Sequence, residues 1–208
     1  MPLASSASAL PLVAGILVFP EVDVLDATGP AEVFGAVSAA TASAGFRVPL
    51  LARGPAPVRT TVGVRLLPEC TVHEIEHLDL LVVPGGDGSR RVVADAAHLQ
   101  AVRTLTQRAS RVLSVCTGAR ILAALGLLDG REVTTHRSAL GEIAERAPTA
   151  VLRPRDRYTD NGAVLTAAGV TAGIDLALHV VGQTYGRPVA AATARYLEHT
   201  WQQAPLSR

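Results

Sequence analysis

The run Arg111-Val-Leu-Ser-Val-Cys-Thr-Gly-Ala119 predicts a buried strand that turns directly into a helix. Residues 112–115 are mostly apolar and β-branched, which favours a strand. Cys116 then stands at the corner, and Gly118 allows the tight turn that presents a nucleophile at the end of a strand. The stretch therefore predicts an α/β fold with a nucleophile elbow at Cys116.

A thiol at such a corner has two sources of activation. The first N–H groups of a helix lack intrahelical partners, and the helix dipole adds partial positive charge there. Both favour the thiolate, which is the nucleophilic form. We therefore expect Cys116 to be exposed, to have a lowered pKa, and to oxidise and react before Cys70, which has no glycine turn beside it. The alternative is that Cys116 is a buried core residue, because free cysteine packs like a small apolar side chain.

The composition suits one domain with a continuous core. The chain has 208 residues, of which 49% are hydrophobic and only 18% are charged. Residues 1–10 predict a disordered tail, and residues 11–208 predict a single domain. No basic residue precedes Arg47, which argues against a signal peptide, and no apolar run reaches the about 18 residues of a membrane span.

Charge and cysteine usage exclude several classes of partner. A net charge of +1 gives no general attraction for nucleic acid or for an anionic membrane. The two cysteines form no CxxC or zinc-ligand pattern, so we expect neither a disulfide framework nor a metal, and a cytoplasmic location. A GxGxxG fingerprint and a P-loop are both absent. We therefore expect no cofactor, and a small molecule as the substrate.

Apolar blocks alternate with helical stretches along the chain. The predicted strands are residues 13–19, 46–52, 79–84, 112–115, 132–135 and 164–167, with a hairpin at 62–67. The predicted helices are residues 30–42, 94–109, 116–125, 139–146, 170–185 and 188–201, the first with Pro30 in its opening turn. This alternation predicts a three-layer α/β sandwich around a mostly parallel, flavodoxin-like sheet.

Three short motifs follow predicted strands. They are Asp26-Ala-Thr-Gly-Pro30, Pro84-Gly-Gly86 and Cys116-Thr-Gly118. Because ligands bind outside the carboxyl ends of parallel strands, we expect the three motifs to converge on one rim of the sheet.

Each of these motifs has a structural and a chemical interpretation. Gly85 and Gly86 form a sharp exit loop, or they bring bare N–H groups close to a ligand. In the second case the N–H groups of Gly86 and Thr117 form an oxyanion-binding pair. Asp26 is either a turn carboxylate or a proton carrier for the thiol, and the residues alone leave both open.

One histidine and two arginines are further candidates. His136 offers a base for the cysteine, although a histidine in a short strand is more often structural. Arg120 lies at i+4 from the cysteine on the same helix face, and Arg137 follows the histidine. Either guanidinium clamps a carboxylate in the pocket, or both face solvent or pair with an acid such as Glu142 or Asp129.

Together these residues resemble the ThiJ/PfpI superfamily of glutamine-amidotransferase-like sandwiches. Within it the chain is similar to the isonitrile hydratase branch and to the ligand-binding domains of AraC-type regulators. The matching pieces, in order, are Phe19-Pro20, Leu25-Asp-Ala-Thr-Gly-Pro30, Glu32-Val-Phe34, Leu81-Val-Val-Pro-Gly-Gly86, Ser114-Val-Cys-Thr-Gly-Ala119, Ala124-Leu-Gly-Leu-Leu-Asp-Gly130, Thr134-Thr-His136 and Thr166-Ala-Ala-Gly-Val-Thr-Ala-Gly-Ile-Asp175. They cover the chain from about residue 12 to residue 200.

The resemblance implies a set of site residues, no metal, and a homodimer. It implies that Cys116 is catalytic with Asp26 as its acidic partner, and that the amides of Gly86 and Thr117 surround the reacting atom. From the motifs we also expect Thr117 to be catalytic. The motifs further place Gly85, His136, Arg120 and Arg137 around the substrate. Two positions depart from the family pattern. Arg137 stands where tryptophan is usual, and Arg120 stands where an apolar residue is usual. If either reaches the pocket, it favours an anionic or carbonyl substrate over a small apolar one.

The leading functional hypothesis is a lyase that resembles isonitrile hydratase. In it the thiolate of Cys116 adds to the isonitrile carbon to give a thioimidate, and Asp26 moves the protons as water releases an N-substituted formamide. The alternatives are a ligand-sensing domain related to AraC-type regulators, a glyoxalase- or deglycase-type enzyme on small aldehydes, and a redox-sensing thiol. A regulator also needs a helix-turn-helix module, and none follows the last predicted helix before Arg208.

Overall fold

The protein is described by a computed structural model over residues 10–202, so all but the last residue of the predicted tail at residues 1–10 lies outside the described part. The strands are β1 Leu12–Leu17, β2 Phe46–Arg47, β3 Leu50–Ala52, β4 Val58–Arg59, β5 Arg65–Leu66, β6 Cys70–Thr71, β7 Leu78–Val83, β8 Ala109–Val115, β9 Glu132–Val133, β10 Val151–Leu152, β11 Tyr158–Asp160 and β12 Val164–Ala167. The helices are α1 Val24–Ala40, α2 Gly88–Ala94, α3 Ala96–Arg108, α4 Ala119–Ala124, α5 Leu140–Arg146, α6 Ala172–Tyr185 and α7 Arg187–Tyr196, with 3₁₀ turns at Cys116–Gly118 and Arg137–Ala139.

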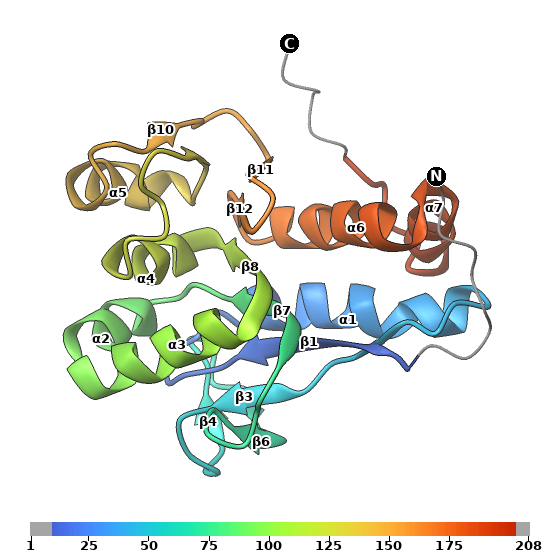
Figure 1. Ribbon diagram of the computed structural model, residues 1–208, viewed down its shortest axis with the longest axis horizontal. Coiled ribbons are helices and arrows are strands. Elements are labelled where there is room, and N and C mark those ends of the chain that lie inside the picture. Colours follow the sequence, from blue (N-terminus) through green and yellow to red (C-terminus); the bar gives the residue numbers. More distant parts are fainter. Residues whose placement is uncertain (1–9, 203–208) are drawn as a thin grey trace.

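A mostly parallel sheet forms the centre of the molecule (Figure 1). Its strand order is β11-β12-β8-β7-β1-β3-β6, with β2 also paired to β1, and β11 is its antiparallel member. In register, Gly15 of β1 lies beside Leu81 of β7, and Leu81 lies beside Val112 of β8. The ends of β1, β7 and β8 therefore meet at one rim, as parallel strands require.

The helices pack in two groups. Helices α1, α6 and α7 contact one another, while α2 contacts α3 and α4, and α4 contacts α5 (Figure 1). Strands β1 and β7 are almost wholly buried, as expected for strands covered on both faces. The predicted flavodoxin-like α/β sandwich is confirmed. No helix in the described part of the chain is both long and apolar enough to cross a membrane.

The first helix begins earlier than the sequence predicted. Helix α1 starts at Val24, so Pro30 lies inside it rather than in its opening turn. Proline within a helix removes the N–H that would bond to the carbonyl four residues earlier, which here belongs to Asp26. The packing of Val33, Phe34 and neighbouring apolar residues in the core compensates for that loss. Asp26 is consequently a helical residue and not part of a loop.

Proline and aspartate break two of the other predicted elements. The predicted strand 46–52 divides into β2 and β3 because Pro49 has no N–H for the ladder. The predicted helix 94–109 becomes α2 and α3, separated by Asp95, whose side chain accepts hydrogen bonds from the N–H groups of Ala97 and His98. The predicted hairpin 62–67 is the β4–β5 ribbon, which pairs apart from the main sheet.

Candidate active site

Cys116 occupies a strained corner between β8 and α4. Its φ is +56°, a left-handed conformation that is unusual for a residue with a side chain and is often found at functional sites. Gly118 makes the corner possible, because a Cβ atom there would lie 2.1 Å from the carbonyl oxygen of Val83. The predicted nucleophile elbow is confirmed.

The three predicted motifs do converge at the ends of β1, β7 and β8. The N–H of Gly85 donates to Asp26 Oδ2 at 3.0 Å, and the N–H of Gly86 donates to Thr117 Oγ1 at 2.9 Å. A Cβ atom on Gly85 would lie 2.6 Å from the backbone nitrogen of Thr117, so the loop after β7 approaches the elbow at backbone distance. The motifs therefore form one hydrogen-bonded site.

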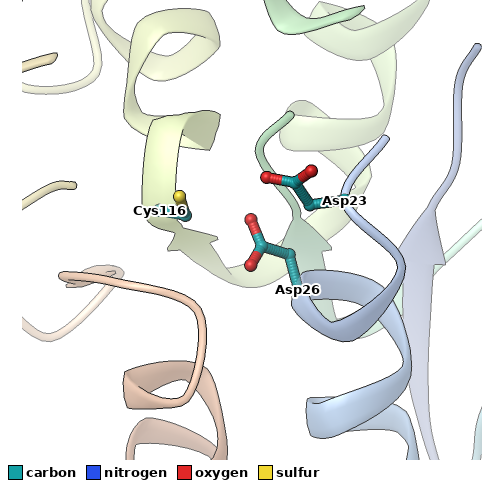
Figure 2. A group of neighbouring side chains, drawn as sticks. All are labelled: Asp23, Asp26 and Cys116. Atoms are coloured by element: carbon teal, nitrogen blue, oxygen red, sulfur yellow. The ribbon is translucent and has the colours of Figure 1, made fainter. Parts of the chain in front are cut away.

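Asp26 is the carboxylate of this site. Its side chain is fully buried, and the Cys116 sulfur lies within 4.8 Å of its carboxylate (Figure 2). Among the described residues, no N–H or O–H group bonds to its Oδ1. Burial raises the pKa of Asp26 to about 7; the Gly85 N–H opposes this rise, and the nearby Asp23 carboxylate adds to it. Asp26 can therefore accept and return a proton near neutral pH.

The thiol differs from the sequence prediction. Cys116 is only 3% exposed, and its pKa is raised to about 12, first by burial and then by the Asp26 carboxylate. The N–H of Thr117 bonds to the sulfur and lowers this pKa, but by less. The prediction of an exposed, low-pKa thiol is therefore wrong. It rested on the stabilisation of a thiolate at the start of a helix and left out the cost of removing water from that thiolate on burial. Cys70 is the more exposed cysteine.

The buried thiol and carboxylate form a coupled pair. Burial raises the pKa of Asp26, so the first proton leaves the pair at about pH 7; burial and the resulting Asp26 charge then retain the thiol proton far into the alkaline range. Between these limits one proton is shared by sulfur and carboxylate. A small fraction of thiolate beside a protonated Asp26 is the reactive form that this arrangement can supply.

Both amides of the predicted oxyanion pair already have partners. The Gly86 N–H bonds to the Thr117 hydroxyl and the Thr117 N–H bonds to the Cys116 sulfur. A ligand would reach the Gly86 N–H after rotation of the Thr117 hydroxyl. That hydroxyl also lies 3.4 Å from the Gly86 carbonyl oxygen, which gives it a second partner.

The His136 ring is hydrogen-bonded within its own turn. Its Nδ1 is 2.8 Å from Ser138 Oγ, and the ring caps the following 3₁₀ turn. The neighbouring Thr135 touches the elbow directly, because its hydroxyl donates to the Cys116 carbonyl oxygen at 2.7 Å. No interaction in the described part of the chain joins the histidine to the thiol, and the ring has a structural partner.

The two arginines differ in their surroundings. Arg120 is 2% exposed, donates from Nε to Glu142 Oε2 at 2.6 Å, and contacts Ser89 Oγ at 3.2 Å. This is the ion pair with Glu142 that the sequence offered as the alternative to a substrate contact. Arg137 is exposed, at the start of the 3₁₀ turn.

Asp23 is a site residue that the sequence reasoning missed. Its carboxylate, that of Asp26 and the Cys116 sulfur lie within 4.8 Å of one another, and both carboxylates turn toward the thiol (Figure 2). The spacing of the two aspartates, i and i+3, places them on one side of a helical turn. That signal was lost because the helix was predicted to begin at Pro30.

Three side chains at such distances also meet the geometric requirement for holding a metal ion. However, Asp26 and Asp23 each give one oxygen to a protein donor, Gly85 N–H and the Thr61 hydroxyl. The remaining donor set is one thiol and two single carboxylate oxygens. This set suits proton exchange between the thiol and the carboxylates.

Comparison with known proteins identifies the family. The model of the DJ-1/PfpI family matches residues 13–183. Isonitrile hydratase of Pseudomonas putida is 34% identical over 89% of this chain and 77% of its own length. The transcriptional regulator GbdR of Pseudomonas aeruginosa is 29% identical over 69% of this chain, which spans only 41% of the regulator.

A solved structure agrees with this assignment. A ThiJ/PfpI family protein from Pseudomonas syringae superposes with a TM-score of 0.82 at 29% identity, covering 93% of this chain and 77% of that one. The family expected from the sequence motifs is thus found by sequence and by structure. The chain belongs to the DJ-1/PfpI family.

Proposed function

We propose that the protein hydrates isonitriles to N-substituted formamides, with Cys116 as the nucleophile. The observation that carries the proposal is the buried thiol–carboxylate pair, in which Asp26 has a pKa of about 7 beside a strained elbow cysteine. The 34% identity to an isonitrile hydratase supports this substrate class. The enzyme is then a lyase that needs no group beyond its own side chains and water.

In the first half of the reaction, Asp26 takes the thiol proton as sulfur attacks the terminal carbon of R–N≡C. The new S–C bond forms, and the proton on Asp26 passes to the same carbon, which gives the thioimidate R–N=CH–S–Cys116. Burial opposes a free thiolate, so the proton moves directly from sulfur to the neighbouring carboxylate, and the pair carries one negative charge throughout.

In the second half, Asp26 is again a base. It takes a proton from water as the oxygen adds to the thioimidate carbon, and it passes this proton to the nitrogen. The tetrahedral intermediate then expels sulfur, which receives the proton of the new hydroxyl group through Asp26, and R–NH–CHO leaves. The Thr117 N–H, which bonds to the sulfur, and the Gly86 N–H, once the Thr117 hydroxyl has rotated away, are suited to hold the developing negative charge.

A panel of substrates tests the proposal. Aryl and alkyl isonitriles and methylglyoxal are mixed separately with the wild type, with Cys116→Ala and with Cys70→Ala as the matched control. We expect formamide from the wild type and from Cys70→Ala, and none from Cys116→Ala. Turnover of methylglyoxal without formamide would move the function to the glyoxalase or deglycase class.

A ligand-sensing role is the second candidate, because a transcriptional regulator is 29% identical over most of this chain. It predicts that isonitriles or other small electrophiles bind without turnover. Calorimetric binding to the wild type with no product after prolonged incubation would favour it over catalysis.

Two expectations from the sequence stay part of the proposal. We propose that residues 11–208 form one domain and that this domain forms a homodimer that binds neither DNA nor membranes. Light scattering coupled to size-exclusion chromatography measures the oligomeric state directly.

A further inference from the structure

Two carboxylates, those of Asp23 and Asp26, lie beside the Cys116 sulfur and make its surroundings negative. Asp23 is the only half-buried member of the acid–thiol cluster, since Asp26 and Cys116 are buried. Its Oδ1 accepts a hydrogen bond from the Thr61 hydroxyl at 2.8 Å, and Thr61 itself is held by the bond from its N–H to the Val22 carbonyl oxygen. The β4–β5 ribbon thus fixes the Asp23 carboxylate beside the thiol.

Two cations on helices α2 and α4, which contact each other beside the elbow, have carboxylate partners. Arg91 forms an ion pair with Glu21, and Arg120 forms one with Glu142. Because these guanidiniums are paired, they do not balance the two aspartates of the cluster. A ligand at the sulfur therefore meets a negative field.

This field acts on any molecule that reacts with the thiol. An atom bonded to sulfur lies about 2 Å from it, so a small electrophile on Cys116 remains within several ångströms of Asp23 whatever its direction of approach. At such distances and at partial burial, like charges repel strongly enough to change rates by roughly ten- to a hundredfold.

We propose that Asp23 makes the Cys116 site selective for neutral and cationic electrophiles and excludes those that carry a carboxylate. For the isonitriles this selectivity rests on the proposed function, and it names neutral or amine-bearing isonitriles as the substrate class. It departs from the sequence-based alternative in which an arginine in the pocket favours an anionic substrate, because Arg120 pairs with Glu142.

Alkylation of the thiol tests the selectivity without any enzymatic turnover. The second-order rates of iodoacetamide, iodoacetate and 2-bromoethylamine with Cys116 are measured by mass spectrometry in the Cys70→Ala background, with 2-mercaptoethanol as the reference thiol. We expect the ratio of the iodoacetate rate to the iodoacetamide rate to be at least about tenfold lower for Cys116 than for 2-mercaptoethanol. A ratio of these rates equal to that of 2-mercaptoethanol overturns the proposal. This measurement uses only the Cys70→Ala protein, so it does not depend on the folding of any other variant.

The variant Asp23→Asn keeps an oxygen for Thr61 and removes the charge. We expect it to restore most of the iodoacetate rate and to slow 2-bromoethylamine. Asp87→Asn is the matched control, because Asp87 follows the Gly85-Gly86 loop and is exposed, and we expect it to leave the ratio unchanged. Equal ratios for wild type and Asp23→Asn would assign the selectivity to another group and overturn the role of Asp23.

A matched pair of isonitriles separates this inference from the proposed function. Methyl isocyanoacetate is neutral and isocyanoacetate is its carboxylate, and we expect kcat/KM to favour the ester at least about tenfold in the wild type and less in Asp23→Asn. If neither compound is hydrated while the alkylation ratios hold, the proposed function fails and the charge selectivity stands. If both are hydrated equally well, the selectivity fails and the proposed function stands.

Discussion

Asp26 and Cys116 are buried side by side where β1 and β8 end, and burial disfavours the charged form of each. The pKa of Asp26 rises to about 7 and that of Cys116 to about 12, although a helix begins at the cysteine. The sequence could predict which two residues meet, because both follow strands of one parallel sheet. It could not predict their ionisation, because the amount of water removed depends on side chains from several elements.

The pair predicts how activity depends on pH. Since Asp26 must be ionised to take the thiol proton, we expect kcat/KM to rise through about pH 7 and then to stay level over the next two pH units. Asp26→Asn should lower turnover by about 100-fold or more and should lose the step at pH 7. If Asp26→Asn keeps the rise of kcat/KM through pH 7, Asp26 has a structural role. The same conclusion follows if the variant loses stability but keeps its activity per folded molecule.

The same pKa predicts that Asp26 destabilises the fold above neutral pH. The folded-state pKa lies above the unfolded value of 3.8, so the folded protein binds more protons between these values, and stability falls as pH rises from about 4 to 7. Asp26→Asn removes this loss. We expect the variant to gain a few kcal/mol in the free energy of unfolding at pH 8 and almost nothing at pH 3.5.

Urea unfolding at the two pH values measures this difference. A stability gain of the same size at pH 3.5 and pH 8 would contradict the raised pKa.

At the scale of elements, the elbow depends on how closely the 3₁₀ turn after β8 approaches the end of β7. Gly118→Ala places a Cβ atom 2.1 Å from the Val83 carbonyl oxygen, and backbone must move to admit it. We expect a loss of about 3 kcal/mol in the free energy of unfolding, together with lower Cys116 reactivity.

Gly141→Ala is the matched control, because Gly141 lies on an exposed helix with nothing within 4 Å of its Cβ position. This control should be neutral or slightly stabilising. Equal thermal midpoints for the two variants would contradict the close approach.

The elements that the sequence located well are those with a strong local pattern. Residues 164–167 form a strand as predicted, and the helix predicted at 170–185 is α6 at Ala172–Tyr185. The two-residue strands β6 and β10 carry no such pattern, since partners from distant elements define them. The start of α1 was misplaced because Pro30 is usual at the beginning of a helix, and this error hid the Asp23–Asp26 spacing.

At the scale of the whole molecule, Asp175 joins three distant segments. This fully buried carboxylate on α6 accepts from Arg157 Nε, from His199 Nε2 at 2.9 Å and from the Gln202 N–H at 2.9 Å. We expect Asp175→Ala to lower the free energy of unfolding by about 2–4 kcal/mol, because it leaves a partly buried arginine without its carboxylate.

Asp129→Ala is the control for Asp175, because Asp129 is exposed, and it should change the free energy by less than about 0.5 kcal/mol. Urea denaturation compares the two. If Asp175→Ala lowers the free energy of unfolding no more than Asp129→Ala does, the hydrogen bonds of Asp175 do not hold the three segments together.

Covalent addition of Cys116 to the isonitrile carbon leaves a mass change that can be observed on the protein. The wild-type reaction with an aryl isonitrile is quenched in acid within the first turnover, digested, and mapped by mass spectrometry. We expect a mass increase equal to the intact isonitrile on the peptide that carries Cys116, and none on the peptide that carries Cys70. Formamide release at the full rate from Cys116→Ala, with no adduct on the wild type, would contradict it.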